Sequence, residues 1–101
     1  MSDVRHDATA HRFTLATGPA EAGSPDAVLA YEVDGDRVVF AHTVVPDEAR
    51  GQGAGTRLVE AAVAHARAQR WAVVPQCPFV AAYMAEHPEA RDVLAPGVEI
   101  G

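Results

Sequence analysis

Three glycines alternate with other residues over a short stretch of this chain, at positions 51, 53 and 55. Because glycine has no Cβ, successive backbone N–H groups in such a stretch can face one point without obstruction. An alanine-rich segment with helical spacing begins near Ala54, so the positive end of its dipole would lie at the same point. The spacing predicts a site for an anionic group, the alternative being a tight strand-to-helix connection with no ligand.

Two common phosphate-binding patterns do not fit this stretch. A Walker loop needs Gly-Lys-Ser/Thr after four intervening residues, and the chain contains no lysine. A dinucleotide-binding fingerprint needs a third glycine where Thr56 stands. The anion is therefore expected to belong to another class of phosphate ligand.

The segment from Arg50 to Gly55 resembles the Q/R-x-x-G-x-G/A signature of the GNAT N-acetyltransferases. The resemblance implies that backbone amides here hold the pyrophosphate of acetyl-CoA, the acetyl donor. The residues implied in binding are Val44, Val45, Arg50, Gly51, Gln52, Gly53, Ala54, Gly55 and Thr56, the two valines through backbone groups along the pantetheine arm. An amide near the end of this strand could also polarise the thioester carbonyl. Arg50 either steadies the loop or touches phosphate, and Thr56 either caps the helix or donates to phosphate.

Further motifs extend the resemblance, over about residues 28–95, to a small single-domain GNAT-like subfamily. They are His42-Thr43, Pro46, Val74-Pro75-Gln76-Cys77-Pro78-Phe79-Val80, Tyr83 and His87-Pro88. One position departs from the pattern, because Val44 stands where many members have glutamate. The departure argues against a mechanism that needs a carboxylate base at that position.

Cys77 is a candidate catalytic residue by its position. It follows a predicted strand and precedes a predicted helix, whose N-terminus can lower the pKa of a thiol. Ligands of α/β folds also gather at the carboxyl ends of parallel strands. The resemblance places Cys77 near the acetyl group, either as a covalent nucleophile or as a neighbour of a direct transfer. The alternative is a small buried core side chain.

Two further residues are candidates for proton transfer. His42 lies on the strand that leads into the glycine stretch, and the ordinary pKa of histidine suits a general base. It fits a core histidine equally, and Glu48 is another candidate base in the loop. The resemblance implies that Tyr83 protonates the leaving CoA thiolate, although its spacing from Phe79 also fits a core aromatic pair. No histidine has metal-ligand spacing with another histidine or with Cys77, so no metal is expected.

Hydrophobic periodicity predicts the elements that position these residues. Strands are expected at 11–17, 27–33, 37–45 and 71–74, and helices at 54–70 and 79–86, with a last turn at 92–95. Asp34-Gly35-Asp36 predicts an antiparallel hairpin, and the strand–helix–strand order predicts a parallel pair. In the 37–45 strand, Val38, Phe40, His42 and Val44 are expected to share one face, with both faces covered. Residues 1–10 show no periodic pattern.

The predicted fold is therefore an α/β (α+β) GNAT-like domain. Its sheet is mixed and mostly antiparallel, with about four or five strands and one splayed parallel pair, and carries one long and one short helix. The expected organisation is a flexible start over residues 1–10, one domain over 11–95 and a tail over 96–101. The length of 101 residues allows one hydrophobic core and no second domain.

Composition excludes several classes of partner. The net charge of −6, without an arginine-rich face, argues against nucleic acid, and no apolar run approaches the length of a membrane span. A polar start and a single cysteine favour the cytoplasm. The predicted function is acetyl transfer from acetyl-CoA to an unidentified small-molecule or peptide amine, by a monomer or homodimer. The alternative is a non-catalytic module that keeps the fold to bind CoA, acyl-CoA or a partner.

Overall fold

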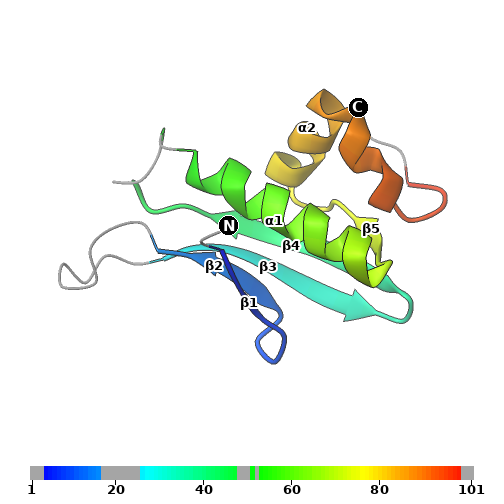
Figure 1. Cartoon of the computed structure of the whole chain (residues 1–101), viewed down its shortest axis with the longest axis horizontal. Helices are drawn as coiled ribbons and strands as arrows, with labels where there is room; N and C mark the ends of the chain where they lie inside the picture. Colours follow the sequence, from blue (N-terminus) through cyan, green and yellow to red (C-terminus); the bar gives the residue numbers. More distant parts are fainter. Residues whose placement is uncertain (1–3, 17–25, 48–50, 52, 99–101) are drawn as a thin grey trace.

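The computed structural model describes residues 4–16, 26–47, 51 and 53–98, and these residues form a single five-stranded sheet in the order β1-β2-β3-β4-β5 (Figure 1). The strands are β1 (Arg5–Asp7), β2 (Arg12–Leu15), β3 (Ala27–Asp34), β4 (Arg37–Val44) and β5 (Ala72–Val74). Neighbours pair antiparallel except β4 and β5, which are parallel. The predicted mixed sheet with one parallel pair is confirmed.

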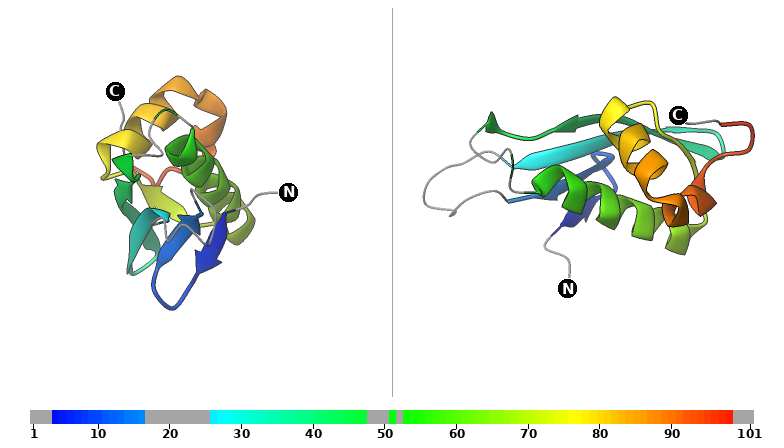
Figure 2. Two further views of the ribbon diagram at one scale, coloured as in Figure 1. Left: turned by 90° about the vertical axis from the view of Figure 1, so that its left-hand side faces the viewer. Right: turned by 90° about the horizontal axis from the view of Figure 1, so that it is seen from above.

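Three helices follow the hairpin: α1 (Ala54–Gln69), α2 (Pro78–Glu86) and the 3-10 helix η3 (Pro88–Val93). Helix α1 lies across one face of the sheet, with α2 and η3 packed beside it (Figures 1 and 2). Its buried stripe contains Leu58, Val59, Ala62, Val63 and Ala66, which are the residues whose spacing predicts the helix. The last turn predicted at 92–95 lies earlier in the structure, because Pro88 begins η3 directly after α2.

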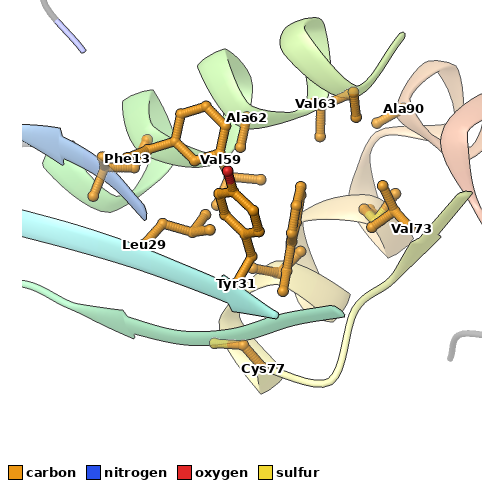
Figure 3. Packing of buried hydrophobic residues seen from close by; sticks show 14 of the residues in the cluster. Phe13, Leu29, Tyr31, Val59, Ala62, Val63, Val73, Cys77 and Ala90 are labelled. Carbon is orange, nitrogen blue, oxygen red and sulfur yellow. The ribbon is translucent and has the colours of Figure 1, made fainter. Parts of the chain in front are cut away.

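The core lies between α1 and the sheet (Figure 3). Phe13, Leu29, Phe40, Leu58 and Val73 are its largest contributors from five different elements, and each is at most 2% exposed. Burying a side chain of this size stabilises the fold by about 1.5–3 kcal/mol. This packing fixes α1 over the strands and so fixes where the helix begins.

The hairpin between β3 and β4 closes as its sequence predicts. Asp34 pairs with Arg37, which leaves a two-residue turn of Gly35 and Asp36. Gly35 has a φ of 60°, in the left-handed region that glycine enters without a Cβ penalty. The turn therefore sets the register that carries β4 towards the glycine stretch.

The N-terminal segment differs from the prediction. Residues 1–10 were expected to lack regular structure, whereas Arg5–Asp7 form the edge strand β1. The His6 ring stacks on Phe13 at 4.5 Å, and its Nε2 lies 2.6 Å from the hydroxyl of Tyr31. These contacts come from residues distant in sequence, so local periodicity does not reveal the strand.

Strand β4 also differs from the prediction beyond its middle. Ala30 pairs with His42 and Tyr31 pairs with Phe40, so Ala41 is an extra residue that forms a β-bulge. Phe40 and Ala41 are both buried, and the alternation of sides then resumes one residue out of phase, with His42 exposed. The expectation that His42 and Val44 share the buried face of Val38 and Phe40 is therefore wrong, as is the expectation that both faces are covered along the whole strand.

Within the described ranges, no helix is both long enough and apolar enough to cross a membrane.

Candidate functional site

The two parallel strands separate after a short ladder. Strands β4 and β5 pair over three residues each: Arg37 with Ala72, Val38 with Val73 and Val39 with Val74. The last link is a backbone bond in which the N–H of Cys77 donates to the carbonyl of Phe40 at 2.9 Å. Beyond it the chain turns into α2, so the edge of β4 past Ala41 is not covered by β5. Such an open strand edge can bind an extended chain through backbone hydrogen bonds.

A cavity of about 470 Å³ opens beside this uncovered edge. Its volume lies within the range of small-molecule sites. The described residues that line it are Thr43, Val45, Gly51, Gly53, Ala54, Gly55, Thr56 and Phe79. None of these side chains is ionisable, so binding in this part of the chain depends on backbone groups, hydroxyls and apolar surface.

The N-terminus of α1 forms one wall of the cavity. Gly51 and Gly53 have φ values of 84° and 79°, a left-handed conformation in which other residues are strained. Gly53 is the N-cap and offers no side-chain cap, and the first turn contains no acidic residue. The first helical bond runs from the N–H of Arg57 to the carbonyl of Gly53, so the three N–H groups before it have no carbonyl within the helix. These donors and the helix dipole suit an anion such as a phosphate group.

The glycine stretch also makes room for an aromatic ring. A Cβ placed on Gly55 would lie 2.9 Å from Cζ of Phe79, so the ring rests against the bare backbone of α1. Phe79 lines the cavity and remains 44% exposed. Sequence reasoning did not assign Phe79 or Thr43 to the site, although both lie within motifs that carry the resemblance.

Cys77 occupies the N-cap position of α2, beside β4 (Figure 3). Its thiol donates a hydrogen bond to the hydroxyl of Thr43 at 3.5 Å, and the residue is 6% exposed. Burial raises the pKa of this thiol, but the Thr43 hydroxyl and the backbone N–H groups of Val80, Phe79 and Thr43 together outweigh burial, and the pKa is lowered overall. The thiolate is the reactive form of cysteine, so this environment favours a nucleophile.

None of the three predicted catalytic residues is among the described residues that line the cavity, although Cys77 contacts the lining residue Thr43. His42 lies on the exposed side of β4 and is not among the lining residues. Tyr83 is half-buried one turn after Phe79, where its ring stacks on His87 at 4.1 Å, and it does not line the cavity either. Burial raises the pKa of Tyr83, with a further rise from nearby carboxylates, so the phenol remains a proton donor at neutral pH. The catalytic roles of both residues stay predictions.

The predicted binding residues divide into three groups. Val45, Gly51, Gly53, Ala54, Gly55 and Thr56 all line the cavity. The side chain of Val44 does not line it and is 62% exposed, so only its backbone could contribute. Arg50 and Gln52 lie outside the described residues, as does the candidate base Glu48.

The described segments contain no group of three or more histidine, cysteine, aspartate or glutamate residues that could hold a metal ion. The features that could hold a ligand at this site are the donors at the start of α1, the edge of β4 and the ring of Phe79.

A comparison with protein-family models agrees with this geometry. The model described as GCN5-related N-acetyl-transferase matches residues 12–93, which include every element from β2 to η3. The matched segment therefore contains the cavity and Cys77. A search of the curated proteins finds no match.

Proposed function

Because the chain belongs to the GCN5-related N-acetyltransferase family, we propose that it transfers an acetyl group from acetyl-CoA to an amine. Membership of this family supports an acyltransferase activity. The family description supports an amine as acceptor, and the cavity and the chemistry of its walls support acetyl-CoA as donor. Each wall can be compared with one part of the donor.

The residues that line the cavity suit the pyrophosphate and the pantetheine arm of acetyl-CoA. The open N–H groups at the start of α1 would hold the pyrophosphate, which no acidic residue in the first turn would repel. The edge of β4 near Val45 suits the amides of the pantetheine arm, and the Phe79 ring supplies apolar surface. When bound, acetyl-CoA would supply a thioester carbonyl that is already activated towards amines.

The observation that carries the proposal is the position of Cys77. A buried thiol with a lowered pKa contacts Thr43, a residue of the cavity wall, at the point where β4 and β5 separate. As a thiolate, Cys77 can accept an acyl group through its sulfur or take up the proton that an amine loses on acylation. In either role the thiol would act beside Thr43, while the glycine stretch would hold the phosphate groups.

The first experiment measures CoA binding and the mass of the intact protein. Calorimetry with CoA should show saturable binding to the wild type, and acetyl-CoA with an amine panel should release free CoA. Absence of CoA binding would contradict the proposal. Because the chain has no lysine, an adduct of about 42 Da formed without acceptor can reside only on Cys77, the N-terminus or a hydroxyl.

The variant Cys77→Ser separates the two roles of the thiol. An adduct that hydroxylamine removes, and that the serine variant lacks, identifies a thioester at Cys77 and a two-step transfer. Transfer to amines without any adduct, but slowed in the serine variant, identifies proton uptake or positioning by the thiol.

A second function is favoured by one observation. The described lining of the cavity contains no ionisable side chain, so no histidine or carboxylate there can accept the amine proton. This is what a non-catalytic CoA or acyl-CoA binder would show. It predicts CoA binding that Cys77→Ser leaves unchanged, together with no release of CoA in the presence of any amine tested.

A further inference from the structure

The bulge in β4 decides which side chain faces Cys77. Without the extra Ala41, the regular alternation from Phe40 would place His42 on the side of the core and Thr43 on the opposite side. With the bulge, Thr43 lines the cavity and His42 points to solvent. Bulges often redirect a side chain next to a functional site, and here the redirected side chain carries a hydroxyl.

The backbone of Cys77 is held from both directions. Its N–H donates to the carbonyl of Phe40 at 2.9 Å, and its carbonyl accepts from the N–H of Ala81 at 3.0 Å. These bonds fix the Cα atom at the junction of β4 and α2, which leaves rotation about χ1 as the main freedom of the thiol. Within the described structure, the side chain that hydrogen-bonds to the sulfur is that of Thr43.

We propose that Thr43, a residue of the cavity wall, is a positioning residue that holds the Cys77 sulfur through its hydroxyl and stabilises the thiolate form. Its side chain is branched at Cβ and therefore has restricted χ1, so its hydroxyl is presented in a defined direction. A contribution of Thr43 to catalysis rests on the proposed acetyl transfer. The effect of Thr43 on the thiol itself does not depend on that function.

A hydroxyl suits both protonation states of the sulfur. It accepts the hydrogen bond of the neutral thiol, as in this structure, and by rotating it donates to the thiolate. The other groups that favour the thiolate are backbone N–H groups of Phe79, Val80 and Thr43, which no side-chain substitution removes. Loss of the hydroxyl should therefore weaken the stabilisation of the thiolate without abolishing it.

The test is a pH titration of the thiol, followed by the ultraviolet absorbance of the thiolate. The chain has a single cysteine, so subtraction of the Cys77→Ser titration leaves the signal of Cys77 alone. Thr43→Val, which keeps the shape of the side chain, should raise the thiol pKa by about 1 unit. Thr43→Ser, which keeps the hydroxyl, should remain within a few tenths of a unit of the wild type.

Thr14→Val is the matched control, because Thr14 is also a half-buried strand residue but lies on β2, outside the cavity lining. It should leave the thiol pKa unchanged. If Thr43→Val folds poorly by circular dichroism, Thr43→Ala removes the same hydroxyl with less bulk and should give the same direction of shift. A wild-type thiol pKa in the folded Val or Ala variant, or an equal shift in the Thr14 control, would overturn the inference.

The two proposals fail in different ways. If Thr43→Val raises the thiol pKa while the wild type transfers no acetyl group, Thr43 positions the thiol and the proposed function is wrong. If the wild type transfers acetyl groups, Thr43→Val should shift the acid limb of the kcat/KM profile to higher pH. Transfer with an unshifted profile and an unshifted thiol pKa would reject Thr43 and leave the function standing.

Discussion

The two ends of helix α1 differ in what surrounds them. Its C-terminus, the closed end, is bonded to other residues of the chain, whereas its N-terminus, the open end, borders the cavity. At its C-terminus, the N–H of Arg70 bonds to carbonyls of the last turn, and the N–H of Trp71 donates to the carbonyl of Ala66 at 2.9 Å. Arg67 in the same turn forms a two-pronged ion pair with Asp92, at 2.7 and 2.9 Å. The partial negative charge of this end is thus met by backbone donors and by a cation from the same chain.

The N-terminus of the same helix has none of these arrangements among the described residues. Its N-cap is Gly53, which has no side chain to form a cap, and its first turn carries no acidic side chain. A helix whose only role was structural would gain stability from a serine, threonine or aspartate cap. The C-terminus of α1 is thus arranged for stability, and the N-terminus is arranged as the proposed ligand site requires.

The largest expected effect comes from giving the open end a negative charge of its own. Thr56→Glu places a carboxylate in the first turn, where it interacts favourably with the helix dipole and competes with a bound phosphate. The thermal stability should not fall, while the affinity for CoA, measured by calorimetry, should fall by about 100-fold.

Thr56→Gln is the control for this prediction, because it adds similar bulk without charge. It should weaken CoA binding by less than about 10-fold. Equal affinities for CoA in the two variants would show that the phosphate groups do not lie at this end of α1.

A smaller effect is expected at the closed end, from the backbone of Arg70. This residue has a φ of 58°, a left-handed conformation that costs about 1–2 kcal/mol for residues other than glycine. Arg70→Gly should therefore stabilise the fold by about 0.5–1 kcal/mol after the greater flexibility of glycine in the unfolded chain is taken into account. Chemical denaturation measures the change, and CoA affinity should stay the same.

Gln69→Gly is the matched control, since Gln69 is the last right-handed residue of α1. There glycine should destabilise the fold by about 0.5–1 kcal/mol. If both glycine variants lose stability, the left-handed Arg70 is not strained and the closing turn is already optimal.

The smallest effect is expected from the ion pair of the closed end. The hydrogen bonds from Arg67 lower the pKa of Asp92, so the pair stabilises the fold fully above the ordinary aspartate pKa, and this stabilisation is lost as the pH falls through the lowered pKa of the folded state. Asp92→Asn should lower Tm by about 2–4 °C at pH 7, and this difference should shrink progressively as the pH falls through the lowered pKa of Asp92. A Tm difference that persists at acid pH would assign the effect of Asp92 to packing instead of charge.

Much of the site could be predicted because its signals are local. Alternating glycines followed by an apolar stripe of period 3.6 predict both the start of α1 and its donors, and the six predicted binding residues that the structure describes from Val45 to Thr56 all line the cavity. Val44 is exposed and does not line the cavity, and Arg50 and Gln52 lie outside the described residues. Cys77 also follows from local signals, since it lies between a strand and the proline that begins α2.

The errors arise where contacts distant in sequence override local patterns. Strand β1 forms because His6 stacks on Phe13 and meets the hydroxyl of Tyr31, partners that no short window contains. Regular alternation along β4 predicts that His42 shares the face of Val38 and Phe40. The bulge at Ala41 depends on the pairing with β3 and reverses that assignment.

The sequence by itself determined the order and type of the main elements, the hairpin turn at Gly35 and the glycine stretch at the start of α1, because each depends on conformational preferences of neighbouring residues. The tertiary structure alone decided that Thr43 and not His42 faces Cys77, that the ring of Phe79 rests on Gly55, and that Asp92 closes the far end of α1. These outcomes depend on strand register and on helix packing, which are fixed only when distant parts of the chain meet.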